Sequence, residues 1–235
     1  MFHSLHDILR RAVCICSLFC FSFAFAQQYQ FVNLTTDDGL VQSQVTSMIQ
    51  DKQGYLWFAT YGGISCFDGL KFENYGIEDG LMGNQVHALF LDSKARMWIG
   101  YTGGIGYLKN KKFYTIHLED DLNQSNVSSI CEDRKGRTWV AFEDAGVGYV
   151  MGNKFIIPEN GGLPGYQVRS VHCDRNGTVW LASANGVFKW NEDNKKFDES
   201  GIEALSKVSA SNITSFENTL YVSTFGSGIY IINTN

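Results

Sequence analysis

The stretch that decides the fold is Asp51-Lys52-Gln53-Gly54-Tyr55-Leu56-Trp57, an Asp-x-x-Gly-x-x-Trp motif. Its aromatic residue returns every 41 residues, and its aspartate keeps the same step. The positions concerned are Trp57, Trp98, Trp139, Trp180 and Tyr221, with Asp51, Asp92, Asp133 and Asp174. A fixed period of about 40 residues is typical of repeat architectures. The sequence therefore predicts a chain built from copies of one structural unit.

Each copy contains four short β-rich runs separated by turn signals. In the second copy these runs cover residues 86–91, 96–100, 105–108 and 112–116. Four short strands without a helical period predict an antiparallel meander. Such a sheet alone would expose both faces, whereas copies stacked around an axis bury them against one another. The fold class predicted is all-β: a β-propeller of four-stranded antiparallel blades, with about five repeats of 41 residues.

The repeated residues then have structural roles. We expect the aspartate to accept hydrogen bonds from the backbone of its turn, and Gly54 to adopt a positive φ there. Ala95 replaces this glycine in the second copy, so that turn is expected to differ slightly. The tryptophans are expected to fill the space between neighbouring sheets, since a large aromatic side chain buries about 150–250 Å². A ligand-stacking surface is the alternative interpretation of the tryptophan series.

The two ends of the repeat array complement each other. Residues 31–34 stand 41 positions before residues 72–75 and so resemble a fourth strand without its first three. The last copy has runs at 213–216, 219–223 and 228–232 but no fourth. An N-terminal strand at residues 29–34 is therefore expected to close the last of five blades and remove an exposed edge. An incomplete, larger propeller is the alternative.

The first 26 residues are typical of a secretory signal peptide. Arg10 and Arg11 precede an apolar run over 12–25, and Ala24-Phe25-Ala26 forms a small-residue cleavage site. We expect cleavage after Ala26, a propeller domain at 27–235, and a periplasmic or secreted location. An uncleaved anchor is the alternative. The net charge of −5 and the pI near 5.5 argue against a nucleic-acid partner, which would need a basic surface.

Three cysteines, Cys66, Cys131 and Cys173, follow the signal segment. An odd number at unrelated repeat positions does not form a disulfide framework, so we expect buried free thiols. None has a Cys-x-x-Cys partner or a histidine at metal-ligand spacing. No cofactor and no metal site are expected.

The repeat resembles the two-component regulator propeller. The pattern Val-x-Ser-Ile/Met-x-x-Asp-x-x-Gly-x-x-Trp, followed by Ala or Gly and a later Gly-apolar pair, covers 45–64 and 127–147. Asp-Gly-Leu at 38–40 and 79–81 strengthens the resemblance. It implies the periplasmic sensor half of hybrid histidine kinases, often a glycan sensor, with a membrane-bound signalling partner or self-association. Sensors of that family carry more repeats and continue into a second β domain, a membrane helix and a kinase, so a truncated fragment of a sensor is an alternative.

A ligand site is expected where loops converge on the propeller axis. An amide precedes each inner strand, at Gln44, Gln85, Asn126, Gln167 and Asn212. Amides offer two donor and two acceptor sites, which suits sugar hydroxyls. Ties between neighbouring blades are the alternative interpretation of this series.

The turns between second and third strands vary although the rest of the unit repeats. They supply Tyr61, Tyr101, Phe142, Glu143, Asp144, Asn185 and Phe225, and Tyr166 is expected to join them. Variable aromatic and acidic residues on a regular scaffold are typical of a binding surface for a carbohydrate or other small ligand. Ordinary loop variation is the alternative.

Catalysis is not expected. A glycosidase needs two carboxylates flanking the bond, and no inner strand begins with Asp or Glu. No Ser/His/Asp arrangement, phosphate loop or His-Glu-x-x-His motif is present. We therefore predict a non-enzymatic ligand-binding propeller, with a polysaccharide- or streptogramin-directed enzyme as the alternative.

Overall fold

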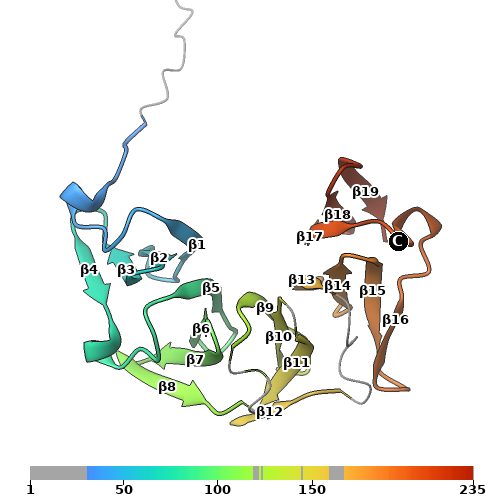
Figure 1. Ribbon diagram of the computed structural model, residues 1–235, viewed down its shortest axis with the longest axis horizontal. Helices are drawn as coiled ribbons and strands as arrows, with labels where there is room; N and C mark the ends of the chain where they lie inside the picture. Colours follow the sequence, from blue (N-terminus) through green and yellow to red (C-terminus); the bar gives the residue numbers. More distant parts are fainter. Residues whose placement is uncertain (1–30, 119–121, 123, 144, 159–166, 235) are drawn as a thin grey trace, which may run out of the picture. The chain divides into compact units, whose positions relative to one another are not determined.

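The structure, a computed structural model, describes residues 31–118, 122, 124–143, 145–158 and 167–234 (Figure 1). Residues Leu34–Asn235 form one compact unit, separate from Met1–Asn33. The predicted signal peptide and its cleavage site lie outside the described residues. The description below concerns the larger unit.

All five sheets are antiparallel meanders in which each strand pairs with the next along the chain. The first holds β1 (Val45–Gln50), β2 (Leu56–Thr60), β3 (Gly63–Phe67) and β4 (Phe72–Tyr75). The second holds β5 (Val86–Leu91), β6 (Met97–Tyr101), β7 (Gly104–Lys109) and β8 (Lys112–Ile116). The third holds β9 (Val127–Glu132), β10 (Thr138–Phe142), β11 (Gly146–Met151) and β12 (Lys154–Ile156).

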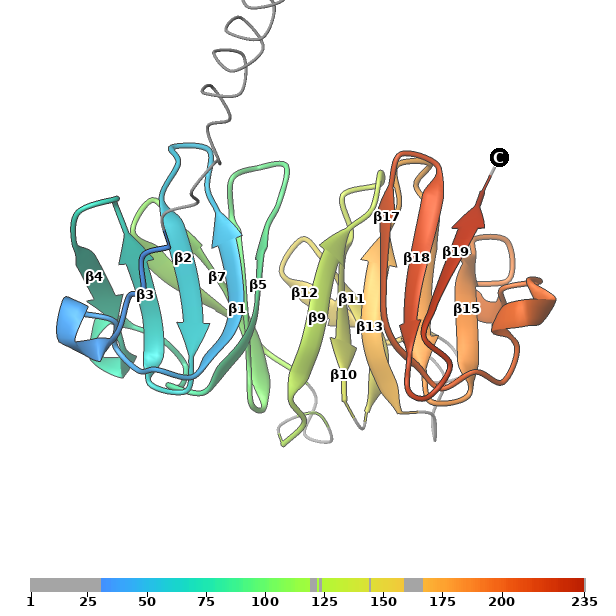
Figure 2. The same cartoon turned by 90° about the horizontal axis from the view of Figure 1, so that it is seen from above.

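The fourth and fifth sheets complete the array. The fourth holds β13 (Val168–Cys173), β14 (Val179–Ser183), β15 (Gly186–Asn191) and β16 (Lys196–Glu199). The fifth holds β17 (Ala210–Phe216), β18 (Thr219–Thr224) and β19 (Ile229–Asn233). The first strands of the sheets, here called the inner strands, contact one another in the order β1, β5, β9, β13, β17. Figures 1 and 2 show the five sheets side by side in this order. The predicted all-β propeller architecture is confirmed.

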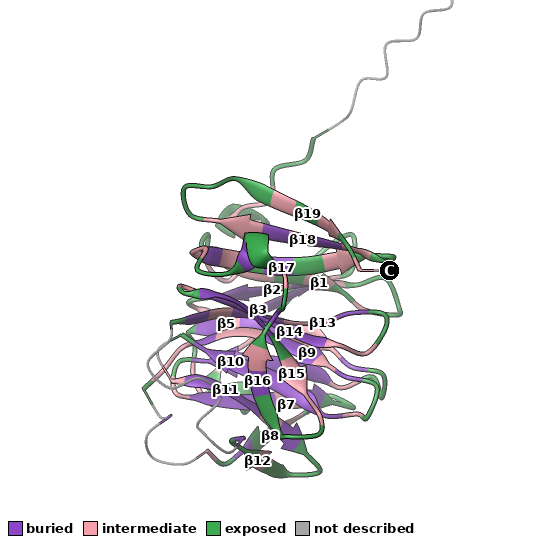
Figure 3. Cartoon of the chain, turned by 90° about the vertical axis from the view of Figure 1, so that its right-hand side faces the viewer, coloured by how far each residue is buried: buried purple, intermediate pink, exposed green. Residues whose placement is uncertain are grey.

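The core lies between neighbouring sheets rather than within one. Four separate apolar clusters occupy the four spaces between consecutive sheets. The repeated tryptophans belong to these clusters, and Trp98 and Trp139 are fully buried. Figure 3 shows the buried residues concentrated in the stacked sheets, while β19 alternates exposed and half-buried positions. Core packing is therefore a role of every tryptophan in the series.

The rim turn, meaning the turn that follows each inner strand, is built by the repeated aspartate. Asp51 Oδ1 accepts backbone N–H bonds from Gln53 at 2.9 Å and Tyr55 at 3.0 Å, as predicted. The sequence did not indicate the second role of this carboxylate, whose Oδ2 accepts the Nε1–H of Trp57 at 2.8 Å. The same indole bond recurs in the next three sheets. The spacing of Asp and Trp therefore fixes the turn and the orientation of the core ring together.

Ala95 adopts the turn that its neighbours form with glycine. Its φ is 56°, and its N–H bonds Asp92 O at 3.2 Å, as Gly54 N–H bonds Asp51 O at 3.1 Å. The expectation of a different turn is wrong, because the aspartate's hydrogen bonds hold this backbone whichever residue fills the position. Alanine is therefore held in the left-handed region that disfavours a Cβ.

The Asp-Gly-Leu segments end short 3₁₀ turns at residues 36–38 and 77–79. Asp38 Oδ2 accepts the N–H of Thr35 at 2.8 Å, and Gly39 takes a φ of 106° that allows the chain to turn back. The leucine that follows, Leu40, is buried. Each residue of the tripeptide thus has a distinct role in delivering the chain to the next inner strand.

The described residues do not show the predicted closure. Residues 31–34 are in no strand, and the fifth sheet has three strands among the described residues. Ile229 and Ile231 on the edge strand β19 are each 67% exposed. The strands that the structure describes are compatible with the alternative of an incomplete, larger propeller.

A disulfide joins Cys131 of β9 to Cys173 of β13, with 5.8 Å between their Cα atoms. The prediction of a free thiol is wrong for these two residues and holds for the buried Cys66. Their separation is 42 residues, one more than the repeat. Side chains alternate between the two faces of a strand, so a shift of one residue turns the two thiols toward each other across the space between sheets.

Candidate binding site at the starting ends of the inner strands

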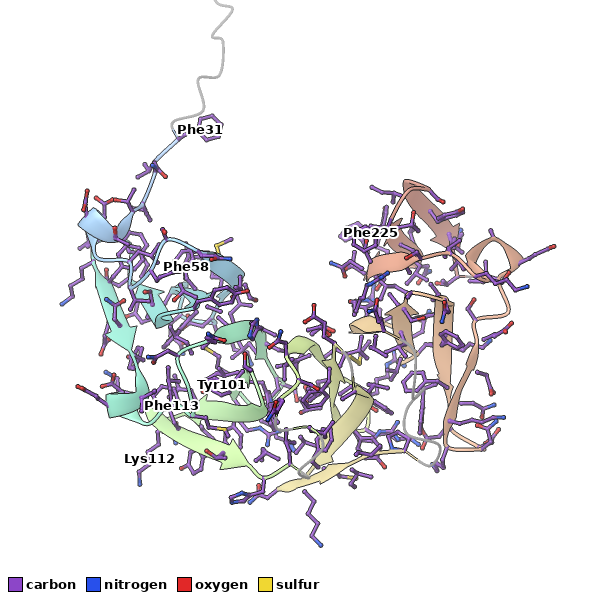
Figure 4. All side chains as sticks on the ribbon, viewed as in Figure 1. Phe31, Phe58, Tyr101, Lys112, Phe113 and Phe225 are labelled. Carbon is purple, nitrogen blue, oxygen red and sulfur yellow. A yellow bond between two sulfur atoms is a disulfide. The ribbon has the colours of Figure 1, made fainter. Side chains whose placement is uncertain are left out.

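A cavity of about 710 Å³ lies where the inner strands begin. Residues from or next to all five sheets line it, namely Thr46, Tyr61, His87, Asn126, Val127, Ser128, Glu143, Gln167, Arg169, Ser211 and Phe225. The lining combines two aromatic rings, two amides, three hydroxyls, one imidazole, one carboxylate and one guanidinium. Figure 4 shows Phe225 on the side of the fifth sheet that faces the inner strands.

A β-bulge in every inner strand shapes this lining. The register between first and second strands shifts in each of the five sheets. The residues left without a cross-strand partner at these shifts are Thr46, His87, Ser128, Arg169 and Ser211. All five line the cavity and are half-buried. A bulge disrupts the alternation of side chains and can re-aim one of them, here toward the common centre.

One side of the cavity carries a continuous hydrogen-bond network. His87 Nε2 lies 2.8 Å from Thr102 Oγ1, which contacts Asn126 Oδ1 at 2.9 Å. Asn126 Nδ2 donates to Glu143 Oε2 at 3.0 Å. The Tyr61 ring packs edge-on against His87, 5.3 Å between centroids. Burial lowers the pKa of His87, and the Glu143 carboxylate opposes this only in part, so the imidazole is neutral at pH 7.

The other side is built around a cation. Arg169 Nη1 donates to Ser209 Oγ at 2.9 Å and to Ala210 O at 3.0 Å. Its guanidinium carbon lies 4.7 Å from the centroid of the Phe225 ring. A guanidinium at this distance is attracted to the ring face. The cavity therefore presents a carboxylate on one side and a cation–aromatic pair on the other.

The predicted amide series divides in the structure. Asn126 and Gln167 line the cavity, whereas Gln44, Gln85 and Asn212 do not. Asn212 Oδ1 accepts the Ser170 hydroxyl at 3.0 Å, and this bond joins the fifth sheet to the fourth. Asn126 also joins two sheets through Thr102. The blade-tie interpretation thus describes Asn212, and Asn126 combines both roles.

The predicted turn residues also divide. Tyr61, Glu143 and Phe225 line the cavity, while Asn185 lines a separate hollow of about 300 Å³ beside the fourth sheet. Tyr101 and Phe142, also predicted for the binding surface, do not line the cavity.

Tyr101 is 2% exposed and Phe142 is fully buried in the clusters between sheets, and Figure 4 shows Tyr101 within the second sheet. Both end a second strand and stand two residues after a core residue, so strand alternation directs them inward. Asp144 and Tyr166 lie outside the described residues.

Six lining residues were missed by the sequence analysis: Thr46, His87, Val127, Ser128, Arg169 and Ser211. Four of them, Thr46, His87, Ser128 and Arg169, were recognisable, because they stand 41 residues apart and differ in chemistry at each copy. The amide series predicted for the site lies two residues earlier in each of these copies. Among the described residues, no three His, Cys, Asp or Glu side chains are grouped as metal ligands, and no helix is long and apolar enough to cross a membrane.

Comparison with known proteins identifies the repeat. A model described as "two component regulator propeller" matches residues 39–62, 121–144 and 162–185. Three of the copies therefore match the two-component regulator propeller repeat. The matches fall on the repeat period and cover the first, third and fourth copies. No curated protein matches this sequence.

Solved structures share the fold at low sequence identity. The extracellular domain of a protein described as a hybrid two-component system, BT3049 from B. thetaiotaomicron, superimposes with a TM-score of 0.67 at 21% identity, over 89% of this chain and 30% of that one. The corresponding BT4673 domain gives 0.66 at 23% identity, over 83% and 29%. Virginiamycin B lyase from Staphylococcus aureus gives 0.66 at 17% identity, over 87% and 73%. The chain thus spans less than a third of the two B. thetaiotaomicron domains.

Proposed function

We propose that this chain is an extracytoplasmic, non-catalytic binding propeller that takes a carbohydrate or another small polar ligand in the cavity at the inner strands. The observation that carries the proposal is the set of five bulged residues. Thr46, His87, Ser128, Arg169 and Ser211 differ in chemistry although each is the unpaired residue at the bulge of its inner strand. Their diversity on a regular framework is what a site adapted to one ligand requires.

The chemistry of the lining supports a polar ligand with an apolar face. Tyr61 and Phe225 offer ring surfaces, and Asn126 and Gln167 offer amides. A sugar presents hydroxyls at its edges and C–H groups on its faces, which matches this combination. Binding sites of this kind orient a ligand with a few polar groups on a largely preformed wall.

We infer the extracytoplasmic location from two features of the chain and from its similarity to extracellular domains. The Cys131–Cys173 disulfide fits an oxidising environment, since such bonds are rare in the cytosol. The N-terminal segment ending at Ala26 has the composition of a cleaved signal peptide. The similar B. thetaiotaomicron structures are extracellular domains. By analogy with them, the partner would be a membrane-bound signalling protein or a second copy of the chain.

A glycan panel read by thermal shift tests the proposal, with product analysis of the same samples. We expect at least one glycan to stabilise the protein without turnover. Tyr61→Ala should weaken its binding at least about tenfold, the equivalent of 1.4 kcal/mol. Tyr114→Ala is a matched control, because Tyr114 is similarly exposed, at 43% against 39% for Tyr61, and lies on β8. Equal loss in both variants, or no stabilisation by any glycan, would refute the site.

One observation favours a second candidate, a lyase acting on a cyclic ligand. His87 and Glu143 line the same cavity, and virginiamycin B lyase shares the fold. A neutral imidazole can act as a general base. Release of a cleaved product from a streptogramin, lost in His87→Gln, would establish this activity and exclude the non-catalytic proposal.

A further inference from the structure

In the second and third sheets, the fourth residue after the rim aspartate is an arginine. Its guanidinium lies in a recurring group of side chains, here called the arginine socket. Arg96 Nε lies 2.5 Å from Asp92 Oδ2, and its guanidinium carbon lies 4.8 Å from the Trp98 ring centroid and 5.2 Å from that of Tyr107. Trp98 and Tyr107 are cross-strand partners on β6 and β7. The socket therefore consists of a carboxylate, the repeated tryptophan and the tyrosine opposite it, with a guanidinium enclosed by all three.

The third sheet repeats this geometry. Arg137 Nε lies 2.6 Å from Asp133 Oδ2, with its guanidinium carbon 5.2 Å from the Trp139 centroid and 5.3 Å from the Tyr149 centroid. Trp139 and Tyr149 are again cross-strand partners. Two independent copies thus show that this arrangement of side chains accommodates a guanidinium.

The first sheet has the same socket without its arginine. Tyr55 replaces the arginine and Cys66 replaces the tyrosine, while Asp51 and Trp57 are retained. Tyr55 N–H still bonds Asp51 Oδ1, as Arg96 N–H bonds Asp92 Oδ1. Asp51 Oδ2 keeps the Trp57 indole bond, and no ion pair to Asp51 is formed among the residues that the structure describes. Asp51 is half-buried, whereas Asp92 is 2% exposed.

A cavity of about 510 Å³ occupies this position, and all four equivalent residues, Asp51, Tyr55, Trp57 and Cys66, line it. Leu91, Met97 and Leu108 of the second sheet also line it. The Tyr75 ring stacks on Trp57 at 5.7 Å with 23° between the planes, which adds a second aromatic wall. The cavity lies at the end of β1, next to Asp51. The binding site described above lies at the start of the same strand, next to Thr46.

The charges around this cavity are mixed. Asp68 and Glu73 join Asp51 on its wall, and four lysines, Lys52, Lys71, Lys109 and Lys111, line it as well. A simple cation would meet the lysines, and a simple anion would meet the carboxylates. A ligand that carries a guanidinium and a carboxylate complements both sets.

We propose that the cavity between the first and second sheets is an arginine-binding site, which takes free arginine or the C-terminal arginine of a peptide. The guanidinium occupies the place that Arg96 and Arg137 fill in the next two sheets, against Asp51 Oδ2 and the Trp57 ring. The ligand carboxylate lies among the lysines. Recognition combines a charge-assisted hydrogen bond with a cation–π contact.

Isothermal titration of the full chain with arginine and with citrulline, its uncharged isostere, tests the proposal. We expect saturable arginine binding and at least tenfold weaker citrulline binding. Tyr55→Arg should abolish arginine binding, because the chain then fills its own socket, and it should raise the melting temperature. Thr178→Arg is the matched control. Thr178 is the equivalent position in the fourth sheet, where Lys189 rather than an aromatic residue faces Trp180, so this variant should bind arginine like the wild type.

A second measurement follows arginine binding on the wild-type chain itself. Arginine should shift the NMR signal of the Trp57 indole N–H, assigned with Trp57→Phe, and leave that of Trp180 in place. The proposal is overturned if arginine shows no saturable binding, if citrulline binds equally well, if Tyr55→Arg retains binding, or if the Trp57 signal does not move.

Discussion

Replacing Arg137 by methionine is expected to destabilise the protein by several kilocalories per mole. The Arg137 side chain is 8% exposed and pairs with Asp133 at 2.6 Å and with Glu192 at 2.8 Å. Its guanidinium carbon also lies within 5.7 Å of the centroids of three rings, those of Trp139, Tyr149 and Trp190. One side chain thus links the third sheet to the fourth by charge and by packing.

The magnitude follows from the partner that is left behind. The Asp133 side chain is 2% exposed, so without Arg137 it becomes a buried carboxylate that has lost its cation. Removing one member of a buried ion pair costs about 3–5 kcal/mol. The lost cation–π contacts lie within about 0.5–2 kcal/mol, and methionine retains part of the packing of the stem. We therefore expect a loss of about 3–5 kcal/mol in the free energy of unfolding.

Urea denaturation of wild type, Arg137→Met and Glu192→Gln measures this loss. Glu192 is 34% exposed and its replacement leaves Arg137 paired with Asp133, so Glu192→Gln is expected to cost less than Arg137→Met. A loss below about 1 kcal/mol in Arg137→Met, or equal losses in the two variants, would show that the buried carboxylate is not the source of the effect.

The same comparison has a predictable pH dependence. Burial opposes the charge on Glu192, but hydrogen bonds from Arg137, Lys135 and Lys195 outweigh it and hold the pKa of this carboxyl far below its ordinary 4.5. A carboxyl with a lowered pKa in the folded state stabilises the protein above pH 4.5, and this contribution disappears as the pH falls toward the folded-state pKa. Arg137→Met removes one of these bonds, so the pKa of Glu192 is lowered less in this variant. The difference in stability between the wild type and Arg137→Met should therefore shrink between pH 7 and pH 3.

Three further changes test the local geometry. Ala95→Gly should stabilise the protein by roughly 0.5–1 kcal/mol, because it relieves a left-handed alanine and the gain exceeds the entropy cost of glycine, and a lower urea midpoint would contradict this. Gly100→Ala should cost about 1–3 kcal/mol although the equivalent position in the other sheets with the repeated tryptophan holds alanine, and unchanged stability would be inconsistent with the geometry. Its Cβ would lie 2.3 Å from Val127 Cγ1. Replacing Cys131 and Cys173 by serine should cost up to about 4 kcal/mol on the chain-entropy estimate for a loop of this length, and a reductant should lower the melting temperature of the wild type but not of that variant.

The residues that repeat allowed the fold to be predicted. Asp51 and Trp57, with their copies, determine turns and core packing by local rules, so strand order and sheet number follow from the period. Closure depends on whether an edge finds a partner in space, and the register of residues 31–34 with β4 carries no information on distance. The period alone therefore could not decide the partner of β19, which pairs only with β18 among the described residues.

The candidate sites depend on departures from the repeat. His87 and Arg169 reach the cavity because bulges re-aim them, and a bulge is a backbone feature that composition does not reveal. Tyr101 was misplaced because it was assigned to a turn rather than to the end of β6. Comparing the copies position by position finds both the bulge residues and the replacement of arginine by Tyr55. Differences at one repeated position are therefore the better guide to function.

The titration of His172 is expected to affect stability in a pH range separate from that of Glu192. Its Nε2 lies 2.7 Å from Ser215 Oγ, and burial lowers the pKa of the imidazole below its ordinary 6.5, an effect that Asp174 opposes only in part. The unfolded chain therefore binds a proton more readily than the folded one, and stability is expected to fall as the pH drops below 6.5. His172→Gln can keep a hydrogen bond to Ser215 but cannot titrate, so its stability should decline less than that of the wild type between pH 6.5 and 5. Urea midpoints at these two values decide the matter, because Glu192 remains ionised throughout this range, and parallel declines in the two proteins would show that His172 is not the group responsible.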